Sequence, residues 1–321
     1  MGEKKEHSEP EVVSSLSALI NENKAGSPTD PTVFWIHLKP KEIAELFLEQ
    51  TGHKVSNGFV KRLLKDLGFK YRKMSKKLAT GQSPYREEQF QIIFDLVLVV
   101  STNTPILSID CKKKEHLGNL YREGKCYSTK PINVFDHDYH YLSEGKVIPH
   151  GIYDMLRNEG YISIGNSSET AEFVKDNLVW WWDNYGIHHY PDAKYILILC
   201  DSGGANSYLH HVFKKHMLEL ATLIGLDIII CHYPPYASKW NPIEHRLFCH
   251  VHQAMKGVVF SDYNLVKELI SKTKTDTGLK VITRLNLKQY PTGIKTTKDE
   301  VDYSRIHFNK TIPHLSYRIA A

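Results

Sequence analysis

The segment HYPPYASKWNPIEHRLF, residues 232–248, combines the end of a strand with the start of a helix. The residues before it, GLDIIIC (225–231), are apolar and β-branched after a glycine, which predicts a short buried strand. Pro234 and Pro235 cannot donate to a strand ladder, so the predicted strand must end there. The segment therefore indicates a strand, a rigid turn and a helix in close succession.

The helix in this segment is predicted to begin at Asn241-Pro242, because these residue types are preferred at the N-cap and at the first helical position. Glu244 then lies in the first turn. Two interpretations of Glu244 stay open from this stretch. The spacing Asn-x-x-Glu fits a capping box, in which the carboxylate only satisfies backbone amides. Alternatively, the helix presents a carboxylate at the end of a buried strand.

Two other buried strands are predicted to end in an aspartate. PILSID (105–110) ends at Asp110, and AKYILILCDSGG (193–204) reaches Asp201 just before a Gly-Gly turn. Further strands are expected at 151–156 and 160–165, followed by a helix that Ser168 would cap, so strands and helices alternate. This order predicts a mixed α/β domain with a central sheet flanked by helices.

Three acids thus follow three buried strands: Asp110, Asp201 and Glu244. Sites in open α/β sheets form beyond the carboxyl ends of strands, so we expect these side chains to meet at one edge. Each aspartate alone could simply end a strand or form a turn. As a set, they match what two-metal phosphodiester chemistry requires, namely carboxylates that hold two Mg²⁺ ions about 3.5–4 Å apart.

Composition indicates a soluble protein of two domains. The chain has 321 residues, a net charge of +5 and no apolar stretch long enough to span a membrane. Its five cysteines include no CxxC pair, which disfavours a disulfide framework or a typical zinc finger. The crowded ligands of FDHDYH (135–140) also lack zinc-motif spacing. The expected compartment is the cytoplasm, with no membrane partner.

Positive charge is concentrated near the N-terminus. Between residues 34 and 77, eleven Lys and Arg face four acids, a local excess of seven. Two amphipathic helical patterns in this region, joined by a short turn with Gly52 and with Ser56 or Asn57 as cap, fit a helix-turn-helix. Such a basic helical module favours a DNA partner, whereas a solvated helix face is the simpler alternative.

We expect DNA contacts from six basic residues in two regions. Some lie on or just after the second helix of the module, and the others flank the predicted acid cluster. They are Lys61, Arg62, Lys65, Arg72, Lys112 and Lys239.

The predicted organisation has five parts. They are a flexible arm or linker (1–33), a helix-turn-helix DNA-binding domain (34–80), a connecting helix (81–103), a catalytic domain (104–260) and a C-terminal appendage (261–321).

The quoted segments also resemble a known family. HYPPYASKWNPIEHRLF resembles the last-acid motif of mariner-like transposases. The chain as a whole, from about Trp35 to Ile294, resembles the DDE transposases of the ISAzo insertion-sequence group. The segments that carry this resemblance are SIDCKKKEHLGN, GIYDMLRNEGYISIG, YPDAK, CDSGG, CHYPP, SKWNPIEHRLF and YPTGIK.

The resemblance implies an RNase H-like fold with catalytic and metal-binding acids at Asp110, Asp201 and Glu244. It also implies Mg²⁺ or Mn²⁺ as cofactor, with two ions, and double-stranded DNA as partner: cleavage at terminal inverted repeats, then strand transfer into target DNA. A homodimer or higher assembly on DNA and association with the nucleoid follow from the same resemblance. One departure is that 42 residues separate Asp201 from Glu244, more than is usual in mariner-like enzymes.

Two other functions remain open from the sequence. A DNA-binding regulator derived from a transposase would lack catalysis, although the presence of all three acids argues against it. An RNase H-like nuclease would cleave DNA without joining strands, and only its products would distinguish it.

Overall fold

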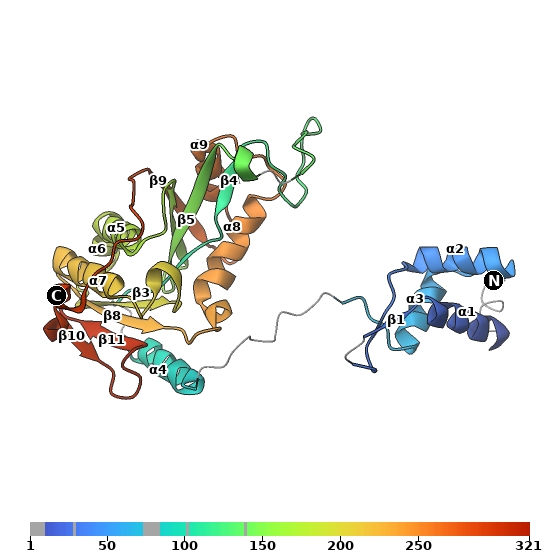
Figure 1. Cartoon of the computed structure of the whole chain (residues 1–321), viewed down its shortest axis with the longest axis horizontal. Coiled ribbons are helices and arrows are strands. Elements are labelled where there is room, and N and C mark those ends of the chain that lie inside the picture. Colours follow the sequence, from blue (N-terminus) through green and yellow to red (C-terminus); the bar gives the residue numbers. More distant parts are fainter. Residues whose placement is uncertain (1–9, 28–29, 73–83, 101–102, 138–139) are drawn as a thin grey trace. The chain divides into compact units, whose positions relative to one another are not determined.

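The computed structural model forms two compact units, Met1–Lys77 and Leu78–Ala321 (Figure 1). The residues that it describes are 10–27, 30–72, 84–100, 103–137 and 140–321. The predicted boundary at residues 80 and 81 and the basic residues Lys73, Lys76 and Lys77 lie outside these ranges. Among the described helices, none combines the length and the apolar character that crossing a membrane requires.

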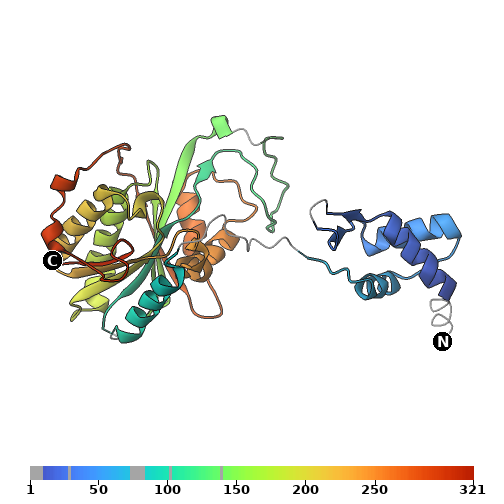
Figure 2. The ribbon, with the colours of Figure 1, turned by 60° about the horizontal axis from the view of Figure 1, so that its bottom comes forward.

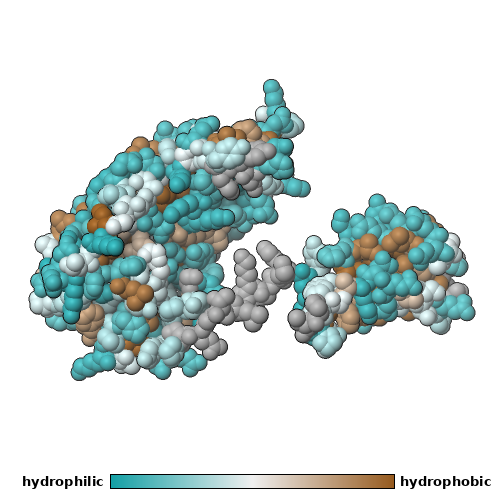
Figure 3. Space-filling model, viewed as in Figure 1, coloured by the Kyte–Doolittle hydropathy of each residue, from teal (hydrophilic) through white to brown (hydrophobic). Residues whose placement is uncertain are grey.

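The smaller unit is built on three amphipathic helices. Leu16, Phe47 and Val60, one from each helix, are buried together in its core. The region expected to be a loose arm, residues 1–33, therefore supplies a helix that completes this core. On the visible face of the unit, apolar residues gather (Figure 3). Its elements are α1 (Pro10–Glu22), β1 (Ala25–Gly26), β2 (Phe34–Trp35), α2 (Pro40–Thr51) and α3 (Asn57–Asp66).

The turn between α2 and α3 follows the predicted chemistry. Gly52 ends α2 in the left-handed region, with φ 71°, a conformation that glycine adopts without steric cost. The Ser56 hydroxyl accepts the Phe59 N–H at 3.2 Å and caps α3. Two short helices joined by a tight turn are therefore present where they were expected.

The larger unit is built around a nine-stranded mixed sheet. Along the sheet the strand order is β10-β11-β8-β7-β3-β5-β6-β9, and β4 pairs with β5 off this path. The central strands β3, β7 and β8 run parallel to one another. β5 is antiparallel to β3, and β6 is antiparallel to β5. The strands up to β8 are β3 (Ile106–Cys111), β4 (Glu115–Leu117), β5 (Gly145–Asp154), β6 (Glu159–Gly165), β7 (Tyr195–Cys200) and β8 (Asp227–His232).

Helices cover both faces of this sheet (Figures 1 and 2). α5 (Ala171–Trp181) and α7 (His211–Ile224) pack on one face in the main core. α4 (Arg86–Val99) packs on the central strands of the other face. The latter face is also covered by η6 (Glu244–Phe248), α8 (Cys249–Ala254) and α9 (Tyr263–Ser271). Burial on both faces explains why β3, β7 and β8 are continuous apolar runs.

The C-terminal region is part of the sheet rather than an appendage. β9 (Lys280–Asn286) pairs with β6 at one edge, and β11 (Ser316–Ile319) pairs with β8 on the other side, followed by β10 (Ile306–Phe308). The expectation of a separate appendage for 261–321 was therefore wrong. β9 and β10 are the two edge strands, and the mixed polar residues of β9, as is usual at a sheet edge, hid its strand character.

Candidate active site

The first two predicted acids lie side by side at one edge of the sheet. Asp110 is the penultimate residue of β3, and Asp201 follows the end of β7 directly. Because β3 and β7 are parallel and Ile109 pairs with Cys200, the residues that follow them emerge together. Parallel register therefore produces the arrangement that the two apolar runs predicted.

The third acid is positioned by Asn241. This buried side chain accepts a hydrogen bond from the Ser108 hydroxyl at 2.5 Å and donates to the Ile109 carbonyl at 3.1 Å. The Ser108 hydroxyl also accepts the Ile243 N–H at 2.9 Å. Ser108 and Ile109 immediately precede Asp110 in β3, so these bonds attach the start of the Glu244 helix to the strand that carries Asp110.

The capping-box interpretation of Glu244 does not describe this helix. The Asn241 side chain is directed to β3, where it binds the Ser108 hydroxyl and the Ile109 carbonyl. The half-buried Glu244 carboxylate is therefore not committed to a cap. The sequence contained both residues of the motif, but only the tertiary structure shows which partner Asn241 binds.

A glycine allows this helix to approach the sheet. Gly151 in β5 is paired with Asp110, and a Cβ atom there would lie 2.7 Å from Phe248 and 2.8 Å from Ile243. Real Cβ atoms do not approach other atoms so closely. The absence of a side chain at Gly151 thus permits the close packing that brings Glu244 near the strand ends.

The acids share one electrostatic environment. Burial and the nearby charge of Asp201 raise the pKa of Asp110 to about 8, with smaller contributions from Glu244 and Glu169. Burial also raises the pKa of Asp201, opposed by a hydrogen bond from the Asn206 amide at 3.2 Å. These carboxylates repel one another at short range, and a cation would relieve that repulsion.

Glu169 is a fourth carboxylate at this site that the sequence analysis missed. Its charge raises the pKa of Asp110, Asp201 and Cys111, and its Oε2 lies 3.7 Å from the Lys114 ammonium. The expected cap of the following helix was Ser168, but α5 is capped by Thr170, which accepts the Phe173 N–H. The Thr170 hydroxyl was the available signal, because a cap at Thr170 leaves Glu169 outside the helix.

The donor set fits a hard divalent cation, although it is not preformed. Carboxylate oxygens are the ligands that Mg²⁺ and Mn²⁺ prefer, and these are buried and mutually repelling. Within the part of the chain that the structure describes, no three His, Cys, Asp or Glu side chains converge closely enough to hold a metal ion. A bound cation would therefore have to draw the carboxylates together. Asp138 of FDHDYH lies outside the described residues.

The predicted DNA-binding residues have different surroundings. Lys112 is buried, and its ammonium pairs with Glu115 at 2.9 Å, which Arg122 also contacts at 2.8 Å. Lys239 is exposed, with its ammonium 5.8 Å from the centre of the Trp240 ring. The four residues of the smaller unit, all exposed, are Lys61, Arg62, Lys65 and Arg72.

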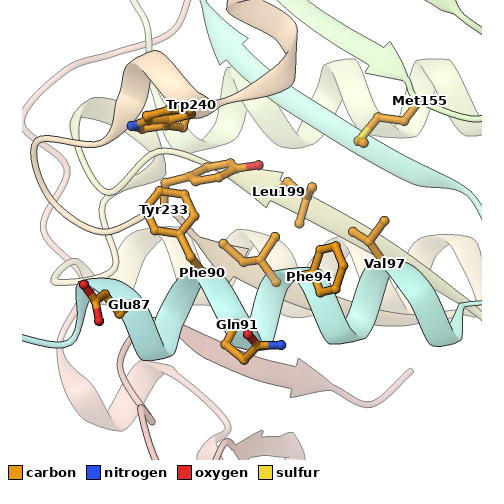
Figure 4. A pocket seen from close by; sticks show the side chains of 10 residues that line it. Glu87, Phe90, Gln91, Phe94, Val97, Met155, Leu199, Tyr233 and Trp240 are labelled. Carbon is orange, nitrogen blue, oxygen red and sulfur yellow. The ribbon is translucent and has the colours of Figure 1, made fainter.

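An apolar hollow of about 530 Å³ lies on the face of the sheet that α4 covers, between α4 and the turn before η6 (Figure 4). Leu199 in its lining belongs to β7 and precedes Asp201 by two residues in the sequence. The rings of Phe90, Tyr233 and Trp240 contact one another at its rim. Apart from Glu87 and Gln91 the lining is apolar, so the hollow adds no further metal ligand.

A family model described as Rhodopirellula transposase DDE domain matches residues 15–321. No curated protein matches the chain. Similar solved structures include the Mos1 transposase paired-end complex with left transposon end, at 16% identity and TM-score 0.47, covering 86% of this chain and 74% of that one. The Mos1 mariner paired end complex with Mn has 16% identity and TM-score 0.44, covering 80% and 69%. The Mos1 strand transfer complex has 15% identity and TM-score 0.47, covering 87% and 75%.

Proposed function

The chain belongs to the DDE transposase family that this model describes, and on that premise we propose that it binds the ends of a mobile DNA element, cleaves phosphodiester bonds there and transfers the strands to target DNA. The observation that carries the proposal is that Asp110 and Asp201 follow one another's register on the parallel neighbours β3 and β7, while the charges of Asp201 and Glu244 raise the pKa of Asp110. The sheet around them supports an RNase H-like assignment.

Asp110, Asp201 and Glu244 would hold the metal, Mg²⁺ or Mn²⁺, as two ions. When bound, such ions activate a water or a 3′-hydroxyl for attack and stabilise the leaving oxygen. The chain's own contribution is to fix the carboxylates on rigid elements: a strand, a strand end and a helix tied to the first strand by Asn241.

Asp110 also couples proton release to ligand binding. With a pKa of about 8, its carboxyl carries a proton at neutral pH in the structure described here. Neutralisation of Asp201 and Glu244 removes part of the cause of that raised pKa, so Asp110 ionises as the site is filled. The site would therefore strengthen its own ligand set at neutral to mildly alkaline pH.

The smaller unit supports DNA recognition. We assign α2 and α3 as the helix-turn-helix, with α3 as the recognition helix. Val60 and Leu63 bury one face of α3, whereas Lys61, Arg62 and Lys65 are exposed and could reach the groove or its phosphates. Arg72, beyond the helix, would contact the backbone.

Lys239 would hold a phosphate near the acids. Lys112 would act on DNA only if its ion pair with Glu115 opened. An assembly of two or more chains on paired DNA ends, in the cytoplasm at the nucleoid, completes the proposal.

The test is cleavage of a supercoiled plasmid that carries the element's ends, with Mg²⁺ present. We compare wild type with Glu244→Gln, and use Glu268→Gln on the exposed face of α9 as the matched control. Glu244→Gln should bind DNA and remain folded but lose cleavage, whereas the control should cleave normally. Undiminished cleavage by Glu244→Gln would refute the assigned site, and cleavage without joined products would favour a nuclease.

A further inference from the structure

The His232 side chain connects β11 to the main chain of Asp201. The ring is fully buried at the end of β8. Its Nδ1 lies 3.0 Å from the main-chain carbonyl oxygen of Asp201, and its Nε2 lies 3.0 Å from the Tyr317 hydroxyl in β11. One imidazole thus spans the distance between a predicted catalytic residue and a strand from the C-terminal region.

The direction of these hydrogen bonds follows from their partners. A carbonyl oxygen can only accept, so Nδ1 must carry the proton and donate it to Asp201. The neutral ring then has its lone pair on Nε2, which accepts the Tyr317 O–H. Burial lowers the pKa of His232 to about 4, which keeps the ring neutral. The Asp201 carbonyl therefore fixes the tautomer, and the Tyr317 hydroxyl satisfies the other ring nitrogen by donating to it.

The contact between His232 and Asp201 lies just beyond the end of β7, where the chain has left the sheet. β7 ends at Cys200, whose carbonyl accepts the Tyr233 N–H at 2.8 Å as the last ladder bond. The Asp201 carbonyl beyond it receives its hydrogen bond from a side chain. On the following residue, the Ser202 hydroxyl donates to the Tyr233 carbonyl. Side chains at the end of β8 therefore fix the backbone that carries the second acid.

We propose that His232 is a positioning residue that holds the Asp201 carboxylate in register with Asp110, and that β11 takes part in the active site through Tyr317. The inference rests on the proposed function, because it gives His232 a purpose only if Asp201 binds the metal. It extends that function by making a C-terminal strand, far from the acids in sequence, a part of the catalytic unit.

Two substitutions of His232 separate positioning from packing. His232→Asn places an amide nitrogen near the position of Nδ1 and can still donate to the Asp201 carbonyl. His232→Gln places its amide near Nε2 and cannot. Both remove the ring, so a role in packing alone predicts similar losses. Since removal of such supporting contacts costs about 10–100-fold in metal affinity or activity, we expect that loss for Gln and a much smaller one for Asn.

Tyr317→Phe removes only the hydroxyl that donates to Nε2 of His232. The matched control is Tyr303→Phe, which breaks a hydroxyl–imidazole contact of the same kind, 2.6 Å from His211, away from Asp201. The Mg²⁺ concentration for half-maximal cleavage should rise several-fold in Tyr317→Phe and stay at the wild-type value in Tyr303→Phe. Equal behaviour of the two variants would overturn the role of β11.

Two measurements do not depend on cleavage. Nitrogen-15 NMR of the full chain should show His232 with a protonated Nδ1 in wild type and in Tyr317→Phe, with the Nε2 resonance shifted in the variant because that nitrogen loses its donor. Amide hydrogen exchange at residues 201–204 should accelerate in His232→Gln more than in His232→Asn. An Nε2-protonated ring, or equal exchange in both variants, would overturn the positioning role even if the chain cleaves DNA. If these measurements agree but wild type does not cleave, the contact is real and the proposed function fails.

Discussion

Asp110 and Asp154 lie on the same pair of strands and have opposite surroundings. β3 and β5 are antiparallel, with Leu107 paired to Asp154 at one end and Asp110 paired to Gly151 near the other. Burial is the largest cause of a raised pKa at both, to about 8 for Asp110 and about 6 for Asp154.

What differs is the hydrogen bonding and charge around each carboxylate. The Tyr190 hydroxyl donates to both oxygens of Asp154 at 2.9 and 2.8 Å, and the backbone amides of residues 156 and 157 donate at 3.1 and 3.2 Å. Asp110 receives the Cys111 N–H at 2.7 Å and faces other carboxylates. A carboxylate that accepts several hydrogen bonds, such as Asp154, stabilises the local turn. A carboxylate surrounded by other carboxylates, such as Asp110, is typical of a binding site.

The largest expected effect separates the two residues by activity. Asp110→Asn keeps the shape of the side chain and removes the charge that would bind metal, so the cleavage rate should fall by on the order of 10²–10³-fold or more. Asp154→Asn should cleave within a few-fold of wild type per folded molecule. Initial rates on the plasmid substrate measure both. A large loss in Asp154→Asn would erase the distinction.

The second expected effect is on stability, for which Asp154 should matter more than Asp110. Asp154→Ala leaves the Tyr190 hydroxyl and two backbone amides without their acceptor, which should lower the free energy of unfolding by about 1–3 kcal/mol. Asp110→Asn removes a carboxyl that must take up a proton on folding at this pH, so its free energy of unfolding should equal or exceed that of wild type. Urea denaturation at pH 7 without divalent metal makes this comparison, and destabilisation by Asp110→Asn would contradict it.

Divalent metal sharpens the contrast further. At a Mg²⁺ concentration ten times the dissociation constant, the free energy of unfolding of the wild type should increase by about 1.4 kcal/mol. Asp154→Asn should gain as much, and Asp110→Asn much less. Thermal unfolding with Mg²⁺, and with Ca²⁺ as a control for ionic strength, measures the gain. Equal stabilisation of all three proteins would place the cation elsewhere.

The smallest effect is in the pH dependence of stability. A raised folded-state pKa means that the native state keeps a proton that the unfolded chain has lost, so stability declines as pH rises from about 4 to the folded value. The decline due to Asp154 should end near pH 6, and that due to Asp110 should continue to about pH 8. Asp110→Asn should therefore remove the dependence between pH 6 and 8, which denaturation in metal-free buffer tests.

The sequence predicted the central strands and the edge at which Asp110 and Asp201 meet. Long apolar runs that end in a charged residue have few alternative interpretations, and parallel pairing places their ends together. The helix that begins at Pro242 was also predictable from Asn-Pro. The strands after residue 261 were not, because the edge strands β9 and β10 carry mixed residues. For residues 10–22 the sequence left both a loose arm and a short helix open, and the structure has the helix.

By itself the sequence determined which residue types were available and in what order: two aspartates at strand ends, a glutamate in a first helical turn and a basic helical module. Only the tertiary structure decided that Asn241 binds β3 instead of capping, that Glu169 joins the acids and that His232 connects Tyr317 to Asp201. The physical reason is the sequence separation over which each kind of interaction acts. Strand and helix signals act between neighbours in the chain, whereas these hydrogen bonds join residues 31 to 133 positions apart, such as His232 with Asp201 and Asn241 with Ser108.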